Sequence, residues 1–113
     1  MKAARFREVA LSFPDAEERE TWGEATFRVR NKIFAMMGKD GRQASIKATH
    51  EEQRALIEER PAAYFLPAYV AQHGWVGVRV ARAPGDEVAE LLTEAWRMTA
   101  TKSAVRAFDE AAG

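Results

Sequence analysis

The spacing of apolar side chains along the first residues predicts an amphipathic helix. Phe6, Val9, Ala10 and Phe13 recur at helical spacing, and Pro14 ends the run because it cannot continue a helix. This apolar stripe needs a partner surface, so we expect the opening helix to pack on a sheet.

From Phe27 to Ala48 the pattern changes to the alternation that is typical of β-strands. Asp40-Gly41 is predicted to form a two-residue hairpin turn, because both central positions of such a turn favour positive φ. Asn31-Lys32 is predicted as another turn. The expected strands are a short edge strand at 21–23 that ends in a turn, then 27–30, 33–37 and 43–48.

The second half of the chain predicts two helices around one further strand. Thr49 and Glu52 form a capping box that begins a helix ending before Pro61. Residues 75–82 alternate as a strand. A helical stripe then begins near residue 88 and continues, past a weak point at residues 101–103, to Val105 and Phe108.

These elements predict an α+β fold with two layers, in the order α-β-β-β-β-α-β-α. Hairpin turns without regular βαβ alternation favour an antiparallel sheet of about five strands with helices on one face. A chain of 113 residues with 47% hydrophobic and 30% charged residues is typical of a globular protein, so residues 1–113 are expected to form a single domain.

The sequence lacks the residue patterns that catalysis, metal binding or cofactor binding would require. The absence of cysteine excludes disulfides, thiolate zinc sites and a cysteine nucleophile. His50 and His73 are far apart, and no phosphate-binding loop or serine-hydrolase elbow occurs. We therefore expect no catalytic residues, no enzyme activity, no cofactor and no metal. The opening residues resemble neither a signal peptide nor an anchor, which predicts a cytoplasmic protein without membrane contact.

Charge is distributed unevenly, although 17 basic and 17 acidic residues give a net charge of zero. Residues 27–48 carry a net charge of plus five and the remainder minus five. Strand alternation is expected to direct basic side chains away from the helices, onto an outer sheet face suited to phosphates and stacked bases. A solvated sheet has the same pattern whether or not anything binds there, and for the pattern alone that interpretation is favoured. The candidate nucleic-acid-binding residues are Arg28, Arg30, Lys32, Lys47 and Arg79.

The aromatic residues between positions 61 and 74 have two interpretations. They form either a packing plug at one end of the sheet, which is favoured, or the wall of a groove made by Tyr64, Tyr69 and Trp75. Trp22 and Trp96 are interpreted as core anchors.

Several blocks of sequence, in order and near the expected spacing, resemble the MmcQ/YjbR family of small bacterial proteins. The resemblance implies a two-layer α+β fold similar to that of secretion chaperones, described in the family as a double-wing DNA-binding arrangement. It implies no catalytic or binding residues. The blocks are Thr21 to Val29, Lys32 to Ala35, Ser45 to Lys47, Pro67 to Val70, and His73 to Val78.

Three functions follow as hypotheses. The leading one is DNA or other nucleic-acid binding through the basic outer sheet face. The alternative is a protein-interaction or chaperone-like adaptor, as a monomer or a dimer, which would use the sheet face or the loop at residues 61–74. The third is a small-ligand binder.

Overall fold

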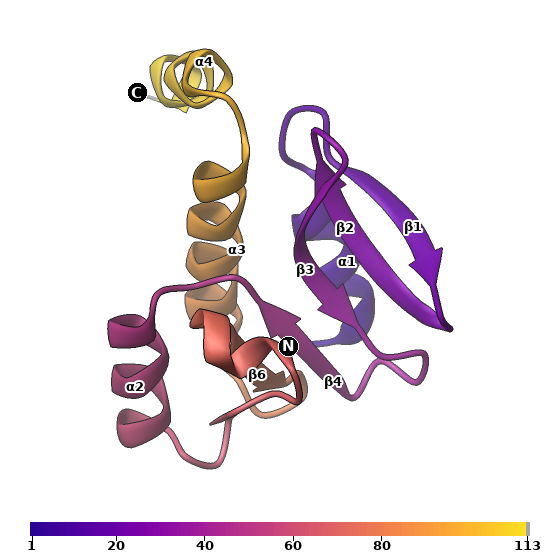
Figure 1. Ribbon diagram of the computed structural model, residues 1–113, viewed down its shortest axis with the longest axis vertical. Helices are drawn as coiled ribbons and strands as arrows, with labels where there is room; N and C mark the ends of the chain where they lie inside the picture. Colours follow the sequence, from indigo (N-terminus) through magenta and orange to yellow (C-terminus); the bar gives the residue numbers. More distant parts are fainter. Residues whose placement is uncertain (113) are drawn as a thin grey trace.

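The computed structural model describes residues 1–112 and contains one sheet flanked by helices (Figure 1). The order of elements follows the predicted one, with three additions: a two-residue strand, a short 3-10 helix (η1) and a separate C-terminal helix. The elements are α1 (Ala3–Leu11), β1 (Glu17–Thr21), β2 (Glu24–Val29), β3 (Lys32–Met37), β4 (Gln43–Ile46), α2 (His50–Glu59), β5 (Tyr64–Phe65), η1 (Val70–His73), β6 (Val76–Arg79), α3 (Gly85–Thr99) and α4 (Lys102–Ala112).

The six strands pair in the order β1-β2-β3-β4-β6-β5, and every pair is antiparallel. The predicted α+β fold with an antiparallel sheet is therefore confirmed. The sixth strand, β5, was missed because two residues are too few to show alternation.

Register assigns the side chains of the sheet to two faces. The inner face, which packs against α1 and α3, carries a row of paired residues that runs through Phe27, Ala35, Ile46 and Val76. Residues on the opposite side form the outer face. Its central row is Arg19, Thr26, Met36, Ser45, Gly77 and Phe65.

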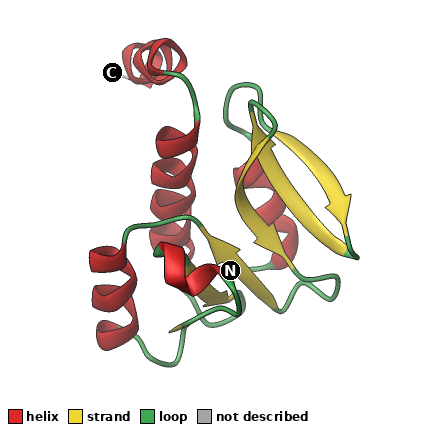
Figure 2. Cartoon of the chain, viewed as in Figure 1, coloured by secondary structure: helices red, strands yellow, loops and turns green. Residues whose placement is uncertain are grey.

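The hydrophobic core lies between the inner face and the helices, which are shown in red in Figure 2. Phe6 of α1 packs on Phe27 of β2, and their ring centroids are 6.0 Å apart. Phe13 stacks on Trp96 of α3 at 5.8 Å, and Trp96 donates a hydrogen bond from Nε1 to the Pro14 carbonyl. Trp96 is therefore the core anchor that the sequence predicted.

Two tight turns join the first three strands, and neither is at Asp40-Gly41. Trp22-Gly23 and Arg30-Asn31 each connect paired strands, and all four residues have positive φ. The prediction of a two-residue turn at Asp40-Gly41 was wrong, because the loop from Gly38 to Arg42 is longer and only Gly41 has positive φ. Asp-Gly is compatible with either loop length.

A β-bulge in β3 changes which side chains face inward. Phe34 and Ala35 together oppose Phe27, and both are fully buried. Beyond the bulge, Ile33 pairs with Arg28, and Lys32 pairs with Val29 on the inner side. One extra residue therefore reverses the alternation of β3 on either side of it.

The last helix, α4, lies beyond the end of α3 and away from the sheet (Figure 1). Phe108 of α4 reaches back to the ring of Trp96, with centroids 5.0 Å apart. Within residues 1–112, no helix has the length and apolar character needed to cross a membrane.

Candidate binding site on the outer face

A hollow of about 940 Å³ lies on the outer face of the sheet. Its walls come from the β1–β2 turn, the β3–β4 loop and the segment that follows β5. Its central side chains, Met36 and Ser45, belong to the middle strands. The lining residues are Trp22, Glu24, Met36, Gly38, Asp40, Arg42, Gln43, Ala44, Ser45, Phe65, Pro67, Ala68, Tyr69 and Val70.

Trp22 stands at one rim of this hollow with 99% of its surface exposed. It occupies the first central position of a two-residue turn with φ of 50°. Asn and Gly are favoured there, because a bulky side chain is strained in the left-handed region. The interpretation of Trp22 as a core anchor was therefore wrong.

Tyr69 stands at another rim of the hollow and is 91% exposed. It is the centre of a γ-turn, in which the Val70 amide donates to the Ala68 carbonyl at 2.7 Å. Its φ of 65° and ψ of −49° belong to the rare, strained form of that turn. Both exposed aromatic residues are thus held in backbone conformations that cost free energy.

Phe65 covers the outer face of β6 between these rims and Arg79. Its ring lies over Gly77, and the Arg79 guanidinium carbon is 4.8 Å from the ring centroid. Arg79 also donates to the Pro61 carbonyl at 3.3 Å. The guanidinium is consequently fixed beside an aromatic surface.

Helix α2 anchors the segment that carries Tyr69. The buried Gln53 amide donates to the carbonyls of Ala71 at 2.9 Å and Trp75 at 2.6 Å. His50 bonds through Nε2 with the Gln72 carbonyl at 2.8 Å. These contacts fix the residues that follow Tyr69 to helix α2.

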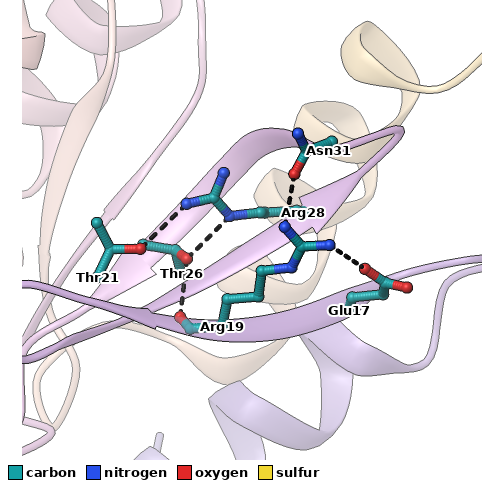
Figure 3. A network of polar contacts seen from close by, with 6 residues as sticks. All are labelled: Glu17, Arg19, Thr21, Thr26, Arg28 and Asn31. Carbon is teal, nitrogen blue, oxygen red and sulfur yellow. Dashed lines mark hydrogen bonds and ion pairs between the residues drawn. The ribbon is translucent and has the colours of Figure 1, made fainter.

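The outer face of β1 and β2 carries a polar network (Figure 3). Arg28 donates to the hydroxyl oxygens of Thr21 at 3.0 Å and Thr26 at 3.2 Å. Arg19 bonds to Asn31 at 2.8 Å and pairs with Glu17 at 3.4 Å. Arg28 is thus oriented by neutral groups only, which leaves its charge uncompensated within the network.

The five basic residues suggested by the sequence do not share one face. Arg28 and Arg79 lie on the outer face, and alternation after the inward Ile46 places Lys47 there as well. Arg30 instead lies in the β2–β3 turn and donates to the Thr99 carbonyl of α3 at 3.5 Å. Lys32 lies on the inner side because of the bulge.

The predicted groove residues also separate. Tyr69 lines the hollow, but Tyr64 is only 1% exposed, on the inner face, and donates to Glu87 at 2.6 Å. Burial, reinforced by this hydrogen bond, raises the pKa of Tyr64 far above its usual value. Trp75 is 9% exposed and does not line the hollow. Tyr64 is therefore packed against the core, whereas Tyr69 is exposed and borders the hollow.

Basic side chains outnumber acidic ones around the outer face. Among residues 1–112, no carboxylate forms an ion pair with Arg28, Arg42 or Arg79. The six basic residues are Arg19, Arg28, Lys39, Arg42, Lys47 and Arg79, and the three acidic ones are Glu17, Glu24 and Asp40.

The chemistry of the hollow is suited to binding. Its surface combines aromatic rings with amide, hydroxyl, carboxylate and guanidinium groups. No group of three or more potential metal ligands occurs within the described part of the chain. The arrangement can stack flat rings and hold anions near its edges.

Comparison with known proteins provides both a family and a structural neighbour. The family model described as YjbR matches residues 11–98. The crystal structure of the Deinococcus radiodurans protein DR2400, with its DUF419 domain, has a TM-score of 0.75 and 20% identity, covering 84% of this chain and 75% of that chain. A search of curated proteins gives no match. The structural neighbour supports the fold, and neither match names a catalytic activity.

Proposed function

The chain belongs to the YjbR family, whose model matches residues 11–98, and we propose that it is a non-catalytic protein that binds nucleic acid through the outer face of its sheet. The observation that carries this proposal is the coincidence of exposed aromatic rings with basic groups that lack carboxylate partners. Phosphates would be contacted by Arg28, Arg42, Lys47 and Arg79.

Electrostatics favours the outer face over the rest of the surface. The whole chain is neutral, so attraction has to come from a local excess of positive charge. The outer face has this excess, whereas helices α2 and α3 are both net acidic. A polyanion would therefore be drawn to the sheet and repelled by the helical side.

The test is binding of a labelled oligonucleotide as a function of salt. We expect affinity to fall as salt rises, because each phosphate contact releases counterions. Arg28→Ala and Arg79→Ala should each weaken binding and reduce the slope of log affinity against log salt by about one. Lys32→Ala removes an equal charge from the inner side and serves as the matched control, with binding unchanged. Salt-independent binding, or equal loss with Lys32→Ala, would contradict the proposal.

A protein partner is the second candidate, because the hollow also presents apolar surface from Met36, Phe65 and Pro67. Leu66 adds to it with 63% exposure beside the same segment. An adaptor that uses this surface would bind a peptide with little dependence on salt, so the same titration separates the two candidates.

A further inference from the structure

The aromatic side chains at the two rims of the hollow do not contribute to the hydrophobic core. The Trp22 and Tyr69 side chains are almost wholly exposed, and both residues have the positive φ that favours glycine or asparagine. Backbone strain of this kind is concentrated at functional sites. Two such residues bordering one hollow point to a ligand with flat faces.

Resting on the proposed function, we propose that Trp22 and Tyr69 stack on unpaired bases, so that the outer face selects single-stranded nucleic acid over duplex. In a duplex each base is already stacked on its neighbours, and only its edges are accessible. A single strand offers free base faces, which aromatic side chains bind with little regard to sequence.

The polar groups of the hollow fit this arrangement. Gln43 and Ser45 belong to β4, and their side chains make no hydrogen bond within residues 1–112. The carboxylates of Glu24 and Asp40 would repel phosphates but accept hydrogen bonds from the amino groups of cytosine and adenine. Base edges would therefore face the hollow, and phosphates would follow the guanidinium groups around it.

The experiment uses a 12-nucleotide strand of A and C only, alone and annealed to its complement, at low salt. We expect the single strand to bind at least tenfold more tightly than the duplex and to quench tryptophan fluorescence. Trp22 dominates this signal because Trp75 and Trp96 are buried. Trp22→Asn and Tyr69→Gly should each weaken single-strand binding roughly five- to 100-fold.

The control variants separate stacking from folding. Trp22→Phe keeps an aromatic ring and should retain most of the affinity. Met98→Ala removes an exposed apolar side chain of α3 that does not line the hollow, so binding should be unchanged. Thermal melts of every variant check that the fold is intact.

The remaining outcomes overturn the stacking inference, either alone or together with the proposed function. Equal, salt-dependent binding of strand and duplex, or full affinity in Trp22→Asn, overturns the stacking inference and leaves the proposed function standing. Binding of neither form overturns both. Quenching of Trp22 by a proline-rich peptide, without quenching by either nucleic acid, overturns the inference in favour of a protein partner.

Discussion

The ring of Phe65 occupies the space into which a side chain at position 77 would project. A Cβ atom on Gly77 would lie 2.5 Å from Cε2 of Phe65. Because Arg79 rests on the same ring, the glycine indirectly positions a guanidinium of the outer face.

We therefore expect Gly77→Ala to displace Phe65, and with it the support of Arg79, and to destabilise the protein by about 1–3 kcal/mol, the usual cost of overpacking. Chemical denaturation measures this loss. The double variant Phe65→Ala/Gly77→Ala should recover part of it, because the clash is gone. Equal loss in single and double variants would show that the ring is not the obstacle.

Trp22 is expected to destabilise the folded protein, because its backbone has a positive φ. Asn is favoured at its turn position, so we expect Trp22→Asn to raise the free energy of unfolding by up to about 1 kcal/mol. Acrylamide quenching of tryptophan emission should fall in the same variant, because the exposed ring has been removed. A clear loss of stability would mean that the ring packs on something in solution.

Gln53 should control the order of the segment that carries Tyr69. Gln53→Met keeps a similar volume but removes both donated hydrogen bonds; the Ala71 carbonyl keeps the Gly74 amide, whereas the Trp75 carbonyl loses its side-chain partner, at a cost of about 1–3 kcal/mol. Amide hydrogen exchange over residues 66–74 should accelerate more than in the core strands. Arg54→Ala, an exposed neighbour on α2, is the control and should leave exchange unchanged.

Glu52 should weaken the fold at neutral pH. Burial, and secondly repulsion from Glu94, raises the pKa of this carboxyl in the folded state. The folded protein therefore binds the proton more tightly than the unfolded chain, and stability falls as pH rises through the folded-state pKa. Glu52→Gln should stabilise at pH 7 by less than about 1 kcal/mol, since the group is partly solvated.

This gain from Glu52→Gln should shrink as pH is lowered toward 4, where the wild-type carboxyl becomes protonated. Denaturation curves at both pH values measure the difference. Glu51→Gln removes a charge from the same helical turn on an exposed side chain and should not stabilise at pH 7. Equal gains in both variants would point to general charge reduction.

The sequence predicted those parts of the structure in which local pattern and tertiary packing agree. The alternation of Val76 and Val78 identified β6, and the apolar stripe containing Trp96 identified α3. Trp22 was predicted to be buried because tryptophan side chains usually are. It is exposed because it lies in the two-residue turn between β1 and β2. An aromatic residue directly before a glycine, between two alternating segments, was the available signal.

The hollow itself could not be predicted, since it depends on contacts between distant segments. Tyr69 lines it with Trp22 only because β4 and β6 pair across the middle of the sheet. The short strand β5 then directs Phe65 outward and Tyr64 inward, a division that two residues cannot reveal in sequence. The family resemblance, by contrast, indicated the correct fold.

The bulge at Phe34 adds one buried ring to β3 between two pairs of residues that remain in register with β2. Deleting Phe34 would return β3 to uninterrupted alternation, with Ile33 still paired with Arg28 and Lys32 still paired with Val29 on the inner side. Such a deletion would remove a fully buried ring from the core and leave the charge of the outer face unchanged. Related chains that lack this residue should therefore differ in the volume of the core, and not in the charge of the binding surface.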